Sequence, residues 1–164
     1  MTRTRKTQAM RVLDQRGIAY EAAVYDARGA FHSGTEAASL LGVPAETVFK
    51  TLVVIRERGD ARPLLVVVPV AERLDLRALG AAIDEKKLRM ATQAEAERLT
   101  GLKVGGISPL AVRPGKFEVV VDERALARGR IHISGGERGV DIALRPHDLV
   151  AAVDARVISF AAGD

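Results

Sequence analysis

The apolar and polar positions of this chain follow two periods. Apolar residues three or four positions apart are typical of amphipathic helices, and short runs rich in Val, Ile and Leu are typical of strands. The first pattern predicts helices over 7–16, 33–42, 75–82, 92–100 and 146–152, and one helical turn over 44–48. The second predicts strands over 18–24, 48–55, 64–70, 117–121, 130–134 and 140–144, with 86–90 as a short strand or a linker.

Capping residues mark several of these helix ends. Thr92 and Glu95 fit the S/T-x-x-E capping box, in which the hydroxyl and the carboxylate each satisfy a backbone N–H group. Ser33 and Glu36 have the same spacing. Glycine stands where a helix C-cap is expected, at positions 17, 42 and 101.

The strand over 64–70 is almost wholly apolar, so we expect cover on both of its faces. A polar turn at 56–60 separates it from the strand over 48–55, which predicts a hairpin. The pattern favours an α/β fold, with α+β as the alternative, in which helices flank a mixed central sheet. No repeat, low-complexity segment or Gly/Ser linker divides the chain, and residues 1–164 are therefore expected to form one domain.

Composition narrows the chemistry. The chain has 164 residues and no cysteine, which excludes disulfides, thiolate nucleophiles, Cys-ligated zinc and iron–sulfur clusters. The 25 basic and 21 acidic residues give a net charge of +4, which permits a polyanionic partner without requiring one. The basic N-terminus lacks the apolar segment of a secretory signal, and no apolar run approaches ~18 residues. We expect a cytoplasmic protein with no membrane contact.

The three histidines do not indicate a metal site. His32, His132 and His147 fall in a loop, a strand and a helix start, without H-x-x-x-H or H-E-x-x-H spacing. His32 is the exception with a possible role in binding, because it precedes a helix N-terminus in a loop that a substrate can reach. Hydrogen bonding within the loop explains it equally well. No metal or organic cofactor is expected.

Two glycine-rich loops are the candidate ligand sites. They cover 105–109 and 134–139, where bare backbone can present N–H groups to an anion or an oxyanion. Neither matches a phosphate loop or a dinucleotide fingerprint, so tight turns are the alternative. Ser108 and Ser134 adjoin the glycine pairs. No G-x-S-x-G is present, which favours turn serines over nucleophiles.

Two charged residues interrupt apolar strands. The ammonium group of Lys50 must reach water, pair with a carboxylate, or meet an anionic ligand in a cleft. The carboxylate of Asp141 likewise needs water or a positively charged partner. One explanation is a Lys50–Asp141 ion pair. Another is an edge-strand position that leaves each charge in water.

Four blocks together resemble the YbaK/EbsC family of stand-alone aminoacyl-tRNA deacylases, within the prolyl-tRNA synthetase editing-domain superfamily. They are K-T-L within 49–52, L-D-L at 74–76, G-G-I-S-P within 101–109 and S-G-G-E-R-G-V-D-I within 133–142. Each is weak alone, but their order and spacing are specific. The resemblance implies a strongly curved mixed sheet or partial barrel flanked by helices.

The resemblance also implies an activity. Such proteins hydrolyse the ester between a wrong amino acid and tRNA, typically in Cys-tRNA(Pro). The implied partners are the acceptor end of the mischarged tRNA and, as a candidate, prolyl-tRNA synthetase. No side-chain nucleophile and no metal are implied, because the thiol of the substrate or a ribose hydroxyl assists an ordered water.

Site residues follow from the same resemblance. Lys50 would hold the terminal adenosine or its phosphate, and backbone N–H groups of the two loops would stabilise the oxyanion. The residues implied in catalysis are Lys50, Gly105, Gly106, Ser134 and Gly135. Those implied in substrate binding are Tyr25, His32, Phe49, Thr51, Ile107, Ser108 and Asp141.

Three alternatives remain at this stage. The enzyme can be specific for alanine or another small amino acid, since one methylene changes binding by only ~1–3 kcal/mol. A catalytically silent module that binds a tRNA 3′ end or a synthetase is the second. A small-molecule nucleotide-binding protein is the third, and the missing phosphate-loop motif disfavours it.

Overall fold

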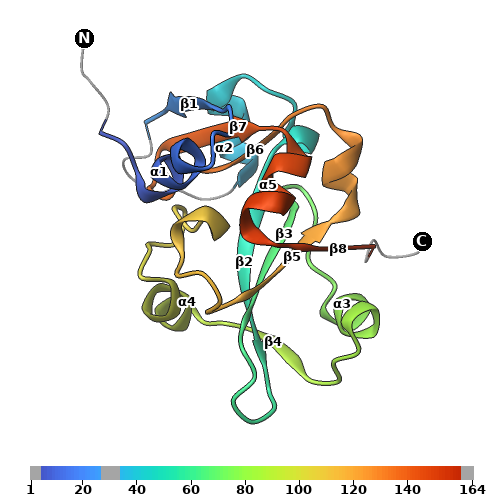
Figure 1. The fold of residues 1–164 in the computed structure, drawn as a ribbon. Coiled ribbons are helices and arrows are strands. Elements are labelled where there is room, and N and C mark those ends of the chain that lie inside the picture. Colours follow the sequence, from blue (N-terminus) through green and yellow to red (C-terminus); the bar gives the residue numbers. More distant parts are fainter. Residues whose placement is uncertain (1–4, 27–33, 160–164) are drawn as a thin grey trace.

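A computed structural model describes residues 5–26 and 34–159 of the chain (Figure 1). Within these ranges the α-helices are α1 (Gln8–Gln15), α2 (Gly34–Leu41), α3 (Leu76–Ile83), α4 (Gln93–Thr100) and α5 (Pro146–Val153). Short 3₁₀ turns are η1 (Ala45–Thr47), η2 (Pro109–Ala111) and η3 (Glu123–Ala127). The strands are β1 (Glu21–Val24), β2 (Phe49–Arg56), β3 (Leu64–Pro69), β4 (Leu88–Met90), β5 (Glu118–Asp122), β6 (Ile131–Ser134), β7 (Val140–Leu144) and β8 (Arg156–Ile158).

Five of these strands form a mixed sheet in the order β4-β2-β3-β5-β8. The long hairpin of β2 and β3 runs through its centre and pairs Phe49 with Pro69, as the polar turn predicts (Figure 1). Strand β5 adds parallel to β3, and β8 adds parallel to β5. The sequence pattern did not predict β8, because three residues are too short to show a period.

Both faces of β3 are covered, as expected for its apolar sequence. On one face, Val54, Leu64 and Val66 pack against Leu79 and Ile83 of α3. On the other face lies the larger apolar cluster, to which α1, α4, α5 and the second sheet contribute. Burial of these two clusters is the main force that holds the sheet and its helices together.

The second sheet has three strands in the order β1-β7-β6. Ile131, Ile133, Ile142 and Leu144 point from its hairpin into the larger cluster. A single parallel bridge joins Val48, just before β2, to His132 of β6. The mixed α/β fold with helices flanking the sheets is confirmed, and its strands are divided over two sheets because the ladder between β2 and β6 stops after this bridge. No closed barrel forms among the described strands.

The predicted caps explain where several helices begin and end. Thr92 and Glu95 make both hydrogen bonds of the capping box on α4, and Gly101 ends that helix with a φ of 73°. Ser33, the proposed cap of α2, lies outside the described residues. No helix in the described part of the chain has the length and apolarity that crossing a membrane requires.

Candidate active site

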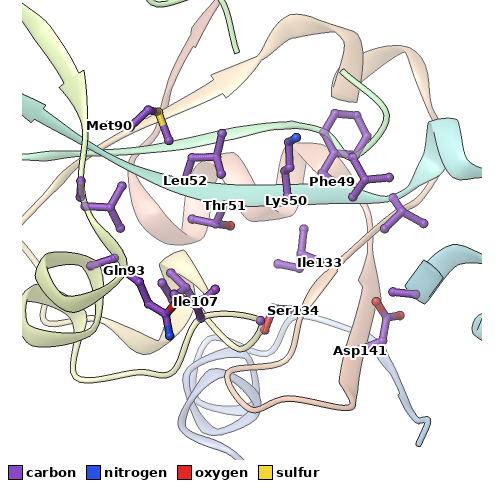
Figure 2. Close-up of a pocket in the computed structure, with 18 of the residues that line it drawn as sticks. Phe49, Lys50, Thr51, Leu52, Met90, Gln93, Ile107, Ile133, Ser134 and Asp141 are labelled. Carbon is purple, nitrogen blue, oxygen red and sulfur yellow. The ribbon is translucent and has the colours of Figure 1, made fainter. Parts of the chain in front are cut away.

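A cavity of about 550 Å³ lies beside β2 (Figure 2). Strand β2 forms one wall. The first glycine loop and the end of β6 form the opposite wall, and residues 90–93, between β4 and α4, border one end. The cavity is large enough for a ligand bigger than a single amino acid, since small-molecule sites span roughly 300–1,000 Å³.

The cavity lies where one edge of β2 has no neighbouring strand over part of its length. The carbonyl of Val53 accepts a hydrogen bond from Ala91 N–H near β4, and Val48 bridges to His132 at the other end. Between these points no described strand pairs with this edge of β2. Because backbone groups of alternate residues face the same edge, those of Thr51 face the gap together with the Val53 carbonyl.

Lys50 lines the cavity from the middle of this open stretch. Figure 2 shows Lys50 and Thr51 projecting to opposite sides of β2, with Thr51 on the side of Ile107 and Ser134. Partial burial lowers the pKa of Lys50, and the charge of Glu72 opposes this shift. Among the described residues, Lys50 Nζ has no hydrogen bond and no ion pair within 4.0 Å.

Thr51 presents a second polar atom without a partner. Its Oγ1 is shielded from solvent and makes no hydrogen bond in the described structure. A buried hydroxyl without a partner costs free energy, so such an atom in a cavity marks a place where a ligand atom can bind. Phe49, also expected at the site, is nearly fully buried and lines the same cavity.

The two glycine loops interlock instead of lying separately on the cavity. A Cβ atom on Gly106 would lie 2.9 Å from the backbone nitrogen of Arg138 and 2.9 Å from the carbonyl carbon of Glu137. Arg138 Nε donates to the Val104 carbonyl at 2.6 Å, which ties the loops together a second time. Gly106 is therefore required for contact between the loops.

The backbone N–H groups of these loops are partly used inside the protein. Gly106 N–H donates to the Lys103 carbonyl at 2.7 Å, and Gly135 N–H donates to the Val140 carbonyl at 2.7 Å. Neither glycine lines the cavity. In this conformation the two groups are not available to an oxyanion, which differs from the role the resemblance implies. Gly105 does line the cavity, and no hydrogen bond from its N–H group is found in the described structure.

The two candidate serines have different environments. Ser108 is fully buried, does not line the cavity, and accepts a hydrogen bond from Leu110 N–H as the N-cap of η2. Ser134 lines the cavity, and its Oγ accepts from Gly136 N–H at 3.1 Å. Ser108 is thus a turn serine. Ile107, within the first glycine loop, is buried and lines the cavity.

Asp141 pairs with a histidine and not with Lys50. Its Oδ2 lies 2.7 Å from Nδ1 of His132, and the residue is only 5% exposed. Burial raises the pKa of Asp141, and the hydrogen bond and charge of His132 lower it. Both explanations considered for Asp141, an ion pair with Lys50 and a charge in water, are wrong. Asp141 and Tyr25 line the cavity, and the charge of Asp141 contributes to the raised pKa of Tyr25 after burial.

Sequence reasoning missed some residues at this site. His132 was interpreted as an ordinary strand-face histidine, although the alternation in 131–134 and the following hairpin could have placed it near Asp141. Met90 and Gln93 also line the cavity, and neither belongs to a recognisable motif. His32 lies outside the described residues. Within the described ranges, no group of three or more His, Asp or Glu side chains is placed to hold a metal ion.

Comparisons with known proteins agree with this geometry. Residues 30–152 match the model of the aminoacyl-tRNA editing domain. A protein of Enterococcus faecalis (strain ATCC 700802 / V583) named "Putative Cys-tRNA(Pro)/Cys-tRNA(Cys) deacylase EbsC" is 31% identical over 146 residues, 89% of this chain and 87% of that protein.

Two solved structures are similar along nearly their whole length. One, described as hypothetical protein APE2540, has a TM-score of 0.81 and 30% identity, over 92% of this chain and 97% of its own. The other, described as "a putative trans-editing enzyme for prolyl tRNA synthetase", has a TM-score of 0.78 and 27% identity, over 95% and 98%.

The fold and the family match are those of an aminoacyl-tRNA hydrolase, the class that the four sequence blocks predict. The chain belongs to the aminoacyl-tRNA editing domain family.

Proposed function

We propose that this protein removes a wrong amino acid from tRNA in trans, with Cys-tRNA(Pro) as its substrate. The observation that carries the proposal is the cavity along the open edge of β2, lined by Lys50, whose Nζ has no ion pair in the described structure. The name of the Enterococcus relative supports cysteine and proline tRNA, and the description of the second structural neighbour supports a link with prolyl-tRNA synthetase.

The ends of the cavity fit different parts of an aminoacylated 3′ end. Lys50 is a cation without an ion pair among residues 5–26 and 34–159, which suits a phosphate or ribose oxygen of the terminal nucleotide. Met90 is exposed, borders the cavity with Gln93, and offers apolar surface to a nucleobase. The aminoacyl group then lies toward Ser134 and Asp141.

Hydrolysis in this cavity needs a water and a place for negative charge. Water adds to the ester carbonyl carbon, the bond from that carbon to the ribose oxygen breaks, and the ribose oxygen takes up a proton. Gly105 N–H and Thr51 Oγ1 are groups at the cavity without partners in the described structure, and they are the candidate donors to the oxyanion.

A serine nucleophile is disfavoured by the contacts of Ser134. Its Oγ accepts from Gly136 N–H, and in the described structure no hydrogen bond joins this Oγ to the ring of His132 or to another base. A nucleophilic serine requires a base within hydrogen-bond reach. We therefore propose that the substrate itself, through its thiol or a ribose hydroxyl, assists the water, and that no metal takes part.

The test is release of labelled amino acid from Cys-tRNA(Pro), Ala-tRNA(Pro) and Pro-tRNA(Pro), with and without a chelator. We expect rapid loss of cysteine alone, unaffected by the chelator. Loss of alanine instead keeps the chemistry and changes the specificity. Bound tRNA without hydrolysis contradicts the proposal and favours a silent binding module. Lys50→Ala should slow this release. Lys116→Ala is its matched control and should not slow it, because Lys116 is exposed and lies outside the cavity.

A further inference from the structure

The three-stranded sheet has one apolar face and one polar face. In the hairpin of β6 and β7, Ser134 lies opposite Asp141 and Ile133 opposite Ile142. Side chains alternate between the faces of a strand, so His132, Ser134 and Asp141 share one face while the isoleucines pack into the core. His132 is the diagonal neighbour of Asp141 on this face.

His132 and Asp141 differ in their access to the cavity. Asp141 lines it, whereas His132 does not. The side chain of Asp141 is 6% exposed and that of His132 is 17% exposed. The 2.7 Å contact joins Nδ1 of His132 to Oδ2 of Asp141. An ionised carboxylate can only accept hydrogen bonds, so Nδ1 must carry the proton when Asp141 is charged. One oxygen of Asp141 is thereby fixed.

The proposed substrate carries a matching charge. Every aminoacyl ester has an α-amino group, and in its protonated form this group is a cation close to the reacting carbonyl. In the cavity, Lys50 is the positive group and Asp141 the negative one. A ligand with an anionic phosphate and a cationic amine can satisfy both.

We propose that Asp141 binds the α-ammonium group of the aminoacyl ester, and that His132 is a positioning residue that keeps this carboxylate ionised and aimed into the cavity. This inference rests on the proposed function for the identity of the ligand. It assigns a role to a histidine that does not touch the ligand and that no motif marks.

The electrostatics give the direction of a pH effect. Burial raises the pKa of Asp141, and His132 offsets part of that shift. The charge of Asp141 also acts on Tyr25, whose pKa is raised, whereas Lys50 projects to the side of β2 opposite Thr51 (Figure 2), and its pKa responds to burial and to Glu72. Without the donor on His132, the pKa of Asp141 rises further, and the carboxylate is lost at a higher pH.

The first experiment compares His132→Phe, which keeps a ring without the donor, with His132→Asn, whose amide can donate from nearly the same place. For His132→Phe we expect the acid limb of the kcat/KM profile to move up by about one pH unit and KM at pH 6 to rise about tenfold. The value of kcat should change less than KM, because the ammonium is bound in the ground state as well as in the transition state. His132→Asn should restore most of the loss.

His147→Phe is the matched control, since His147 is exposed at the start of α5 and outside the cavity. It should leave the profile unchanged. An unchanged acid limb and KM in a folded His132→Phe variant would overturn the inference while leaving the proposed function in place.

The second experiment does not depend on hydrolysis. Calorimetry measures binding of 3′-amino-3′-deoxyadenosine acylated with cysteine, and of the same compound acylated with 3-mercaptopropionate, which lacks the amine. The wild-type protein should bind the first at least about tenfold more tightly near pH 7, a preference of about 1.4 kcal/mol. Asp141→Asn should abolish this preference, and His132→Phe should reduce it.

The outcomes separate the two proposals. A preference for the amine that depends on His132, without any release of amino acid from tRNA, supports the inference and contradicts the proposed function. Equal binding of both compounds by a wild-type protein that does hydrolyse Cys-tRNA(Pro) contradicts the inference alone.

Discussion

Strand β2 and the glycine loops form opposite walls of the cavity, but their polar groups are bonded in different ways (Figure 2). On β2, Lys50 has no ion pair and Thr51 Oγ1 has no hydrogen bond in the described structure. In the loops, the N–H groups of Gly106 and Gly135 both donate to backbone carbonyls. The β2 wall therefore has polar groups free to bind a ligand, whereas most polar groups considered in the loop wall are already hydrogen-bonded within the protein.

This difference distinguishes groups that bind from groups that support. Nearly all buried polar atoms in proteins have partners, so an atom without one in a cavity indicates a missing ligand atom. Atoms already bonded within the protein give shape and rigidity instead. We therefore expect substitutions on β2 to lower activity without lowering stability, and substitutions in the loops to lower stability and activity together.

The largest effect is expected for Gly106→Ala. Its new Cβ would lie 2.9 Å from backbone atoms of the second loop, and such overpacking costs about 1–3 kcal/mol of unfolding free energy. Activity should be abolished as the loops move apart. Denaturation and the deacylation assay measure the two effects.

Gly129→Ala is the control for this substitution, because nothing lies within 4 Å of its added Cβ. It should change stability by less than about 0.5 kcal/mol. A Gly106→Ala variant with wild-type stability and no activity would contradict the supporting role of the loops, because the glycine would then act on the ligand directly.

Lys50 should give the next largest effect, a loss of activity without a loss of stability. Lys50→Ala is expected to remain folded and to lower turnover on mischarged tRNA at least tenfold, or about 1.4 kcal/mol of transition-state stabilisation. Unchanged turnover would exclude Lys50 from the reaction.

Lys50→Met adds a measurement of stability against pH to this test. Burial lowers the pKa of Lys50 in the folded protein, so its charged form opposes folding at every pH below that lowered value. The methionine variant should therefore unfold at a higher denaturant concentration than the wild type at neutral pH. This advantage should vanish as the pH rises past the usual lysine value.

The smallest effect is expected for Thr51→Val. If Thr51 Oγ1 binds the substrate, losing one hydrogen bond of about 0.5–1.5 kcal/mol should reduce kcat/KM roughly twofold to thirteenfold. Stability should not fall, because the hydroxyl has no partner to lose. Thr47→Val is the contrasting variant. The Thr47 hydroxyl donates to the Pro44 carbonyl at 2.7 Å, so its loss should affect stability and spare activity.

The local elements could be predicted from the sequence because short-range rules determine them. The capping box at Thr92 and Glu95, the hairpin of β2 and β3, and the fully buried β3 all follow from patterns within about ten residues. The division into two sheets could not be predicted. It depends on where the ladder between β2 and β6 stops, which is a long-range contact.

The candidate site was predicted in the same uneven way. Lys50 stood out because a charge in an apolar strand is conspicuous, and the structure places it in the cavity. Gly106 was expected to donate its N–H group to the oxyanion, whereas in the structure its bare Cα packs against the backbone of Glu137 and Arg138. The partner of Asp141 depends on strand register, and His132 was therefore missed.

The interlocked glycine loops also determine how the protein can open. Gly106 packs on the backbone of the second loop, and Arg138 returns a hydrogen bond to Val104, so neither loop can detach without breaking the contacts of the other. Segments joined in this way unfold locally as one cooperative unit. A fluctuation that loosens one loop therefore also removes contacts of the other, and we expect the two loops to open together.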